Sequence, residues 1–345
     1  MKMSVLCAGH ASPHVGWVSI DELAYLLVHY YKAELLSPRQ APSSWSDRLL
    51  RRQQTRYYPL SCSGGDVLLV VCHAPNDLAL IDVIPDCRGK FARIYAWVTD
   101  SYFQAGFGGT AACYDAITVT AHEDVAFPRD HFGVPVHQLY QGADCLSWVP
   151  RTEAQRAIDV IGFGRMPPSY HAYFSRLFHV PDSPHLYLHS PLGNIAGPSV
   201  RLERGMLFKV LHRARVSLAF HLFVEPQGDR PRSMMVTSRW LESLLSGCIV
   251  AGKRPISRMA DEMLFWPGAT LELADNPRQA GEELLDLLAR NDELHAQRRT
   301  NIRQMILHHD WRDRILKLSG LFGLPVPTEL TEDIERLQAL AAKFV

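Results

Sequence analysis

The segment 237–252 places a helix, a helix-ending glycine and a strand one after another. Its first part is apolar at helical spacing, at Trp240, Leu241, Leu244 and Leu245. Gly247 stands where such a helix needs a residue in the left-handed conformation. Residues 248–251 then read as a short buried strand. A helix that feeds directly into a buried strand is the repeating unit of a parallel α/β sheet, so the segment predicts an α/β fold.

The first turn of this predicted helix carries groups that suit a phosphorylated ligand. Thr237 or Ser238 is expected to cap the helix, whose N-terminus attracts anions. Arg239 adds a guanidinium fork for phosphate, and Glu242 one turn later could accept both hydroxyls of a ribose. These groups together predict a nucleoside diphosphate site.

The first half of the chain repeats the strand–helix pattern. Its predicted strands cover 3–8, 66–72, 92–98, 114–120 and 133–136. Helices are expected at 20–31, with Ser19 as cap and Glu22 in a capping box, and at 78–84 and 123–132. A strand, a glycine-containing loop and a helix at the start predict a Rossmann-like domain.

Polar side chains follow the predicted strands of this half, where ligands of open α/β sheets bind. The groups best placed for chemistry are His73, Asp77, Asp100 and Ser101, and the loop after the first strand carries His10 and His14. Three of them are candidates for a catalytic base: Asp100, His10 and His73.

A second domain is expected after a linker at 148–154, because the chain has 345 residues. Its first strand, 158–163, ends in Gly164-Arg165, where the backbone can approach a ligand closely and the arginine can meet a phosphate. Pro167 occupies the position where a dinucleotide-binding fingerprint needs its third glycine, so that class of site is disfavoured.

The arrangement Arg239-x-x-Glu242-Ser243-x-x-Ser246-Gly247, followed by an apolar strand, resembles the donor-site helix of GT-B glycosyltransferases. The similarity is to group 1 of that class and, within it, to the CgeB-like branch. Two further matches are Gly133-Val134-Pro135 with the turn Gly142-Ala143-Asp144, and the ending His309-x-Trp311-x-x-Arg314.

Two positions depart from the pattern of that family. Many members have a lysine a few residues after the arginine that matches Arg165, and this chain has none there. Many members also have two glutamates eight positions apart. Met234 occupies the position of the first, and Glu242 matches the second, which is expected to contact the ribose. The contacts to the diphosphate and to the sugar are therefore expected to differ from those of typical members.

The resemblance implies two Rossmann-like domains with an interdomain cleft. Residues 1–150 would form the acceptor domain, 151–325 the nucleotide-sugar-binding domain, and 326–345 a C-terminal helix that could pack back on the first domain. The implied activity is metal-independent transfer of a hexose from a nucleotide sugar to an acceptor hydroxyl, in bacterial glycan or glycoconjugate biosynthesis. The acceptor would be a glycan, a lipid-linked molecule or a protein.

The resemblance also implies roles for the residues of the donor site. The side chains and backbone groups expected to hold the donor are those of Gly164, Arg165, Thr237, Ser238, Arg239 and Glu242. Arg239, the helix N-terminus and Arg165 would neutralise the leaving diphosphate in place of a metal ion. The nucleotide sugar is a co-substrate, and no other cofactor is implied. Inversion of the sugar needs a base and retention does not; the sequence leaves both open, and the resemblance leans slightly to retention.

Composition limits the other classes of function. Lys+Arg and Asp+Glu are 36 each, and this balance argues against a broad nucleic-acid surface. The seven cysteines are scattered, without the spacing of a structural zinc site. No apolar run approaches the roughly 18 residues of a membrane span, so a cytoplasmic location is expected. The basic helix predicted at 44–54 could give a weak contact with the inner membrane face.

Two rival interpretations remain at this point. A two-lobed protein could hold a nucleotide or sugar without catalysis, and an NAD(P)-dependent enzyme would share the same domain type. Turnover of a nucleotide sugar would separate the first from a glycosyltransferase, and the failed fingerprint near Pro167 counts against the second.

Overall fold

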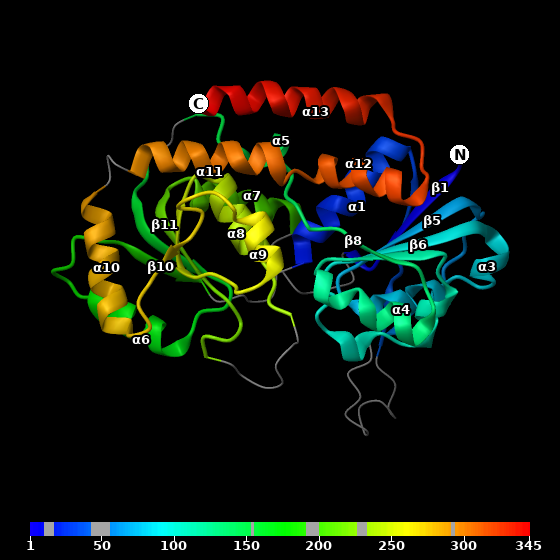
Figure 1. Cartoon of the computed structure of the whole chain (residues 1–345), viewed down its shortest axis with the longest axis horizontal. Helices are drawn as coiled ribbons and strands as arrows, with labels where there is room; N and C mark the ends of the chain where they lie inside the picture. The colour runs from blue at the N-terminus through cyan, green and yellow to red at the C-terminus, as the bar shows by residue number, and fades with distance from the viewer. Residues whose placement is uncertain (10–16, 43–55, 153–154, 191–199, 226–232, 291–293) are drawn as a thin grey trace. The chain divides into compact units, whose positions relative to one another are not determined.

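The computed structural model describes residues 1–9, 17–42, 56–152, 155–190, 200–225, 233–290 and 294–345 (Figure 1). The chain forms two compact units. The first unit contains Met1–Tyr140 and Lys317–Pro327, and the second contains Gln141–Leu316 and Thr328–Val345. The structure thus divides the chain at Gln141, whereas the sequence placed the first boundary near residue 150.

The first unit is built on a six-stranded parallel sheet with the order β2-β1-β5-β6-β7-β8. Its strands are β1 (Met3–Cys7), β2 (Glu34–Leu36), β5 (Gly65–Cys72), β6 (Phe91–Val98), β7 (Ala116–Val119) and β8 (Val136–Gln138). The central strands are buried along most of their length, as expected for a sheet covered on both faces. A small antiparallel pair, β3 (Gln40–Ala41) with β4 (Arg56–Tyr57), stands apart from this sheet.

The helices of the first unit confirm most of the predicted elements and correct two. They are α1 (Val18–Tyr31), α3 (Cys87–Lys90), α4 (Ala126–Phe132) and the 3₁₀ helices η3 (Pro75–Val83), η4 (Gln104–Gly106), η5 (Gly109–Cys113) and η6 (His122–Asp124). The predicted cap Ser19 is wrong, because α1 begins at Val18 and Ser19 is buried inside it. Residues 78–84 were predicted as an α-helix, but the chain there forms η3, whose short tight turns start at Pro75.

The strand order reverses at β1 in the first unit. The chain runs from β1 to β2 on one side and then crosses to β5 on the other side of β1. Loops that leave the carboxyl ends of such neighbouring strands diverge and leave room for a ligand. The end of β1 at Cys7 and the residue after β5, His73, lie at this position.

The second unit repeats this plan with a five-stranded parallel sheet of order β10-β9-β11-β12-β13. Its strands are β9 (Ile158–Phe163), β10 (Tyr187–Ser190), β11 (Ala214–Phe220), β12 (Ile249–Lys253) and β13 (Leu271–Glu272). Its helices are α5 (Cys145–Trp148), α6 (Pro168–Phe178), α7 (Val200–Leu211), α8 (Ser238–Leu245), α9 (Arg258–Met263), α10 (Pro277–Ala289), α11 (Leu294–His308), α13 (Thr328–Ala341) and η7 (Ala342–Phe344). The order again reverses at β9, so the carboxyl ends of β9 and β11 form the expected ligand position.

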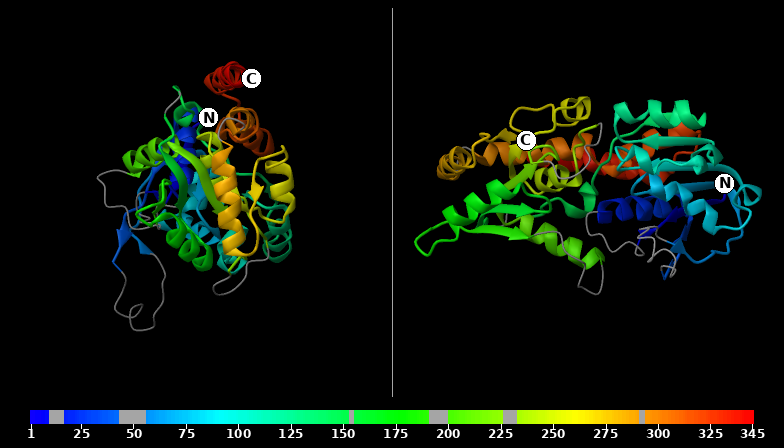
Figure 2. Two further views of the ribbon diagram at one scale, coloured as in Figure 1. Left: turned by 90° about the vertical axis from the view of Figure 1, so that its left-hand side faces the viewer. Right: turned by 90° about the horizontal axis from the view of Figure 1, so that it is seen from below.

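The last helices connect the two parts of the chain. Helix α12 (Trp311–Phe322) starts in the second unit and ends in the first, where Phe322 stacks on Tyr95 at 4.2 Å between ring centroids. The sequence suggested that the final helix could return to the N-terminal domain. The structure groups α13 with the second unit, where it runs along α11 (Figures 1 and 2). Leu330, Leu337 and Ala341 are buried there, which provides the apolar contact that holds α13.

Residues around the start of α12 form a buried ionic network in the second unit. Arg312 contacts Asp144 at 2.9 Å, Asp310 at 3.2 Å and Asp333 at 3.5 Å. Burial raises the pKa of Asp310 to about 6, with Asp144 adding to this rise and Arg312 opposing it. The network joins Asp144, the last residue of the predicted turn Gly142-Ala143-Asp144, to α12 and α13, so Asp144 contributes to packing within this unit.

Among the described residues, no helix is both long enough and apolar enough to cross a lipid bilayer. The basic helix predicted at 44–54 lies outside the residues that the structure describes.

Candidate functional site

Helix α8 has the position and the polarity of the predicted donor helix. Its apolar face is fully buried, and Gly247 ends the turn with φ +70°, as predicted. Thr237 is the N-cap residue by backbone conformation, but neither it nor Ser238 provides the predicted cap: the Thr237 side chain makes no cap hydrogen bond and Ser238 is already inside the helix. In the described part of the chain the buried Thr237 Oγ1 has no hydrogen-bond partner. A buried hydroxyl without a hydrogen-bond partner costs folding free energy. A ligand bound at the helix N-terminus would supply that partner.

A second buried polar atom lies in the same region. His189 lies beside Gly162 in the pairing of β10 with β9, and among the described residues its Nε2 atom has no hydrogen-bond partner. Burial lowers the pKa of His189, and the charges of His171 and Arg239 lower it further. The ring is therefore neutral at pH 7, so Nε2 can donate or accept a hydrogen bond.

The end of β9 and the first turn of α8 are in direct contact. Arg239 Nη1 donates to the Arg165 carbonyl at 2.8 Å, and its guanidinium lies 5.9 Å from the centre of the Phe163 ring. Gly164 has φ +70°, and a Cβ there would lie 2.6 Å from Arg239 Nη2. Only glycine fits this position, so the backbone of the loop and the guanidinium can share one small region.

Arg239 remains a cation in this environment. Burial lowers its pKa to about 10, helped by the charge of Arg165 and opposed by Glu242. At pH 7 the guanidinium is thus fully protonated, and its desolvation strengthens any attraction for an anion. The expected contact of Arg165 and Arg239 with a phosphate stays a prediction.

Glu242 lies deeper than its predicted role suggests. Its side chain is 6% exposed, and Oε1 accepts a hydrogen bond from Arg204 Nη1 of α7 at 2.6 Å. This charged pair is buried on both sides and closes the space between α7 and α8. The role of Glu242 on a ribose stays a prediction, but its first partner in the structure is Arg204.

In the first unit, His73 is held between two carboxylates at the point where the strand order reverses. Its Nε2 lies 3.2 Å from Asp21 Oδ1 and its Nδ1 lies 3.2 Å from Asp77 Oδ2. Burial lowers the pKa of His73, but the hydrogen bonds and charges of Asp21 and Asp77 outweigh it and raise the pKa to about 9. The imidazole therefore keeps its proton at pH 7.

Asp100 is joined to His73 through Trp17. Trp17 stacks on the His73 ring with centroids 4.9 Å apart and planes 7° apart, and its Nε1 donates to Asp100 Oδ2 at 3.0 Å. The Asp100 backbone N–H also donates to the His73 carbonyl at 2.8 Å. Two of the three predicted base candidates thus occur side by side. The third, His10, lies outside the described residues, as does His14.

Ser101 is used differently from its neighbours. It is buried, and its hydroxyl donates to Asp124 at 2.6 Å. This contact holds the loop after β6.

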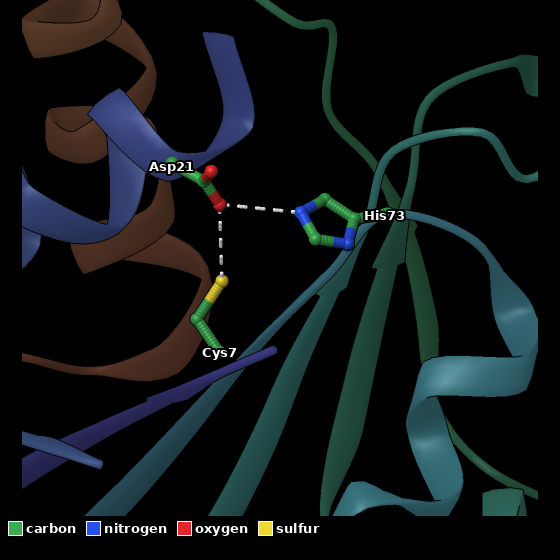
Figure 3. A group of neighbouring side chains, drawn as sticks. All are labelled: Cys7, Asp21 and His73. Carbon is green, nitrogen blue, oxygen red and sulfur yellow. Dashed lines mark hydrogen bonds and ion pairs between the residues drawn. The ribbon is translucent and has the colours of Figure 1, made fainter. Parts of the chain in front are cut away.

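Cys7, Asp21 and His73 form a buried cluster in which each offers an atom that could ligate a metal, all within 4.8 Å of one another. Figure 3 shows Asp21 between the other two, with its Oδ1 atom accepting from Cys7 Sγ at 3.7 Å and bonded to His73 Nε2. Burial raises the pKa of the Cys7 thiol, and Asp21 raises it further. A metal would have to displace protons from both the thiol and the imidazole, because the deprotonated forms are the ligands. Because the Cys7 thiol and the His73 imidazole both keep their protons, the cluster is a hydrogen-bond network.

The raised pKa of His73 predicts a pH-dependent stability. Its folded value of about 9 lies above the ordinary 6.5, so the stabilisation is complete below pH 6.5 and is lost as the pH rises through 9. His73→Gln should therefore cost roughly 3 kcal/mol at pH 6 and much less at pH 9.5. Urea unfolding at both pH values measures this. The exposed His131, replaced in the same way, is the control. A cost that does not change with pH would contradict the assignment.

Sequence reasoning missed three residues of these sites. Asp21 was visible only as an acidic residue in the first turn of a helix, Trp17 as part of a loop, and Arg204 as part of a helix face. Each gains its role from a partner far away in the sequence, as in the pair Arg204 and Glu242. An acidic residue soon after a first Rossmann-like strand was the one available signal.

Comparison with known proteins bears on the region around α8. Residues 190–320 match a family described as glycosyl transferase-like. This match begins in β10 and includes α8. No curated protein sequence matches the chain.

Among solved structures, an alpha-glucosyltransferase in complex with UDP and a 13-mer DNA is similar in fold, with a TM-score of 0.53 and 11% identity over 90% of this chain and 96% of that chain. AviGT4, a glycosyltransferase involved in avilamycin A biosynthesis, has a TM-score of 0.48 and 15% identity over 99% of this chain and 98% of that chain. TarM of S. aureus has a TM-score of 0.47 and 9% identity over 74% of this chain and only 55% of its own.

The predicted fold class is confirmed by these observations. Both units are built on parallel sheets, and the fold is similar to that of the alpha-glucosyltransferase with a TM-score of 0.53. The chain has a GT-B fold of two Rossmann-like domains, and its part from residue 190 to residue 320 is similar to the glycosyl transferase-like family.

Proposed function

We propose that the protein is a glycosyltransferase that binds a nucleotide sugar on its second unit. The observation that carries this proposal is the N-terminus of α8, which lies within the region matching the glycosyl transferase-like family. In this region Thr237 Oγ1 and His189 Nε2 are buried and have no hydrogen-bond partner in the described part of the chain, and the charge of Arg239 acts on His189. Diphosphate oxygens would satisfy these donors.

The chemistry assigned to the two units is a displacement at the anomeric carbon of the sugar. The acceptor oxygen forms the new glycosidic bond while the bond from the sugar to the diphosphate breaks, and the bonding electron pair leaves with the nucleoside diphosphate. The helix N-terminus and Arg239 stabilise the charge that develops on this leaving group. Such neutralisation by protein groups is consistent with a metal-independent reaction.

We assign the acceptor to the first unit and the proton transfer to Asp100. A general base must be unprotonated at the working pH, and His73 holds its proton at pH 7 because its pKa is about 9. His73 then acts as a positioning cation that carries the stacked Trp17, whose indole N–H orients Asp100. This assignment corresponds to an inverting reaction.

The finer features of the proposal rest on the resemblance of the sequence motifs to those of group 1 GT-B glycosyltransferases. They are transfer of a hexose, membership of the CgeB-like branch, an acceptor that is a glycan, lipid-linked molecule or protein, and a role in bacterial glycan or glycoconjugate biosynthesis. The corresponding location is the cytoplasm or the inner face of the membrane.

Nucleotide binding to Thr237→Val tests the proposal directly. UDP, GDP, ADP and CDP are titrated by calorimetry, and one of them should bind to the wild-type protein. Loss of one hydroxyl contact should weaken that ligand roughly tenfold. The same substitution at Thr331, an exposed position on α13, is the matched control and should change nothing.

Two outcomes would count against the proposal. One is a folded protein that binds none of the nucleotides, and the other is unchanged affinity in Thr237→Val. Binding of a nucleotide without release of nucleoside diphosphate from its sugars, over a panel of acceptors, would instead support the non-catalytic binding protein.

A further inference from the structure

The second unit contains a large cavity whose lining is strongly basic. The cavity has a volume of about 1070 Å³ and is bordered by the segment after α5, by α11 and by α13 with η7. Its cationic residues include the arginines Arg151, Arg156, Arg215, Arg298, Arg299 and Arg336. Lys343 adds a further cation, and no carboxylate occurs among the described residues that line it. The chain as a whole is neutral, so this charge is local.

The cavity lies at the amino ends of the strands, whereas the N-terminus of α8 lies at their carboxyl ends. Arg156 reaches the amino ends of the strands, where it donates to the carbonyl of Ala214, the first residue of β11, and to Ser246 at 2.9 Å. Gly164 and Arg239, by contrast, lie at the carboxyl end of β9. A six-residue strand such as β9 spans about 20 Å, so the two regions are separate.

Neighbouring carboxylates offset only part of the positive charge of this cavity. Arg215 pairs with Asp159 at 2.7 Å and Arg336 with Asp333 at 2.5 Å. Arg299 donates to backbone oxygens of Lys343 at 2.9 Å and Val345 at 2.8 Å, contacts that orient the guanidinium. The side chains of Arg151 and Lys343 are exposed to solvent at the rim.

Between the cations the wall is apolar, with Leu146, Val149, Ile302 and Leu340. The volume is comparable to the roughly 300–1,000 Å³ of small-molecule sites. A concave surface whose charges have one sign focuses the electrostatic potential and attracts ions of the opposite sign. A guanidinium group can donate two parallel hydrogen bonds to two oxygens of a phosphate. A flat or extended partner would not fill such a space.

We propose that this cavity is a second ligand site, which binds a polyphosphate group. The group belongs either to a free small molecule or to the head group of a lipid, since both present clustered phosphate charge. The proposal does not depend on the glycosyltransferase assignment, because none of its residues lies at the N-terminus of α8.

The test is binding of inorganic tripolyphosphate, measured by calorimetry, to the wild-type chain and to the double variant Arg151→Glu with Lys343→Glu. Affinity should fall about tenfold or more in the double variant, and raising the salt concentration should weaken the wild type. Affinity for the nucleotide that binds at α8 should stay unchanged. The exposed Arg176 on α6, replaced by Glu, is the control for a charge reversal outside the cavity.

Vesicles of phosphatidylcholine with a tenth of phosphatidylinositol bisphosphate distinguish the two sources. Binding to these vesicles, lost in the double variant, assigns a lipid head group, and binding of tripolyphosphate alone assigns a free ligand. The milder pair Arg151→Gln with Lys343→Gln serves if the charge reversal disturbs folding. Wild-type protein that binds neither probe, or equal loss in the Arg176→Glu control, would overturn the proposal.

Discussion

Replacing Asp100 by Asn is expected to lower the rate of sugar transfer by about 10²–10⁴-fold, while nucleotide affinity stays as in the wild type. The amide cannot take a proton from the acceptor hydroxyl, but its oxygen can still accept the Trp17 indole N–H that Asp100 Oδ2 accepts at 3.0 Å. The local structure should therefore persist, and the loss should appear in kcat with little change in the KM for the donor.

The control for this experiment is Asp130→Asn on α4. Asp130 lies in the same unit, and its side chain is 58% exposed, so its rate should match the wild type. A wild-type rate of sugar transfer in Asp100→Asn would show that Asp100 is not the catalytic base. A retaining reaction, which needs no base, would then be the better description, and the stereochemistry of the product would decide it directly.

Replacing Glu242 by Leu should destabilise the protein by about 3–5 kcal/mol. The substitution leaves the Arg204 guanidinium, whose side chain is 4% exposed, in a buried position without the carboxylate that lies 2.6 Å from it. Taking a charge out of water is costly, and removing the carboxylate takes away the opposite charge that offsets this cost. Urea unfolding at pH 7 gives the free energy of unfolding for each variant.

The double variant Glu242→Leu with Arg204→Met separates the ion pair from packing. It removes both charges and should regain most of the stability, since well-packed apolar pairs often replace buried ion pairs at no net cost. Glu262→Leu, which breaks the exposed pair with Arg258, should cost under about 1 kcal/mol. A small loss in Glu242→Leu alone would show that Arg204 reaches water or another acceptor.

This result also bears on the predicted ribose contact of Glu242. A loss of nucleotide binding in Glu242→Leu could come from altered packing of α7 against α8, because the pair with Arg204 connects the two helices. Thr237 and Arg239 are cleaner probes of the donor site, since they lie at the N-terminal end of α8.

Local sequence patterns predicted the elements on which both sites are built. The helix before Gly247 and the strand after it occur as α8 and β12, and the apolar run ending at Cys72 occurs as β5. These features depend on periodicity, on the left-handed turn that glycine allows and on burial of short apolar runs, all of which are properties of neighbouring residues. The same patterns placed His73 and Asp100 at strand ends, because carboxyl ends of parallel strands meet at one edge.

Helix boundaries were less well predicted where local signals competed. The positions of Ser19 and Glu22 in the sequence fit a capping box, yet α1 starts before Ser19 and buries it. Burial of Val18 and Ile20 against the sheet outweighs a cap, which contributes only about 1 kcal/mol.

The chemistry of each site was decided by contacts between distant parts of the chain. The charge state of His73 depends on Asp21, which α1 brings to within 3.2 Å, and the partner of Glu242 is an arginine on α7. Likewise, the basic cavity collects arginines from segments near residues 151, 215, 299 and 336. A pKa or a buried ion pair depends on the distance to charged groups and to water, and linear spacing does not contain these distances. The fold class could thus be inferred from neighbouring residues, whereas the protonation states and the partners required the folded chain.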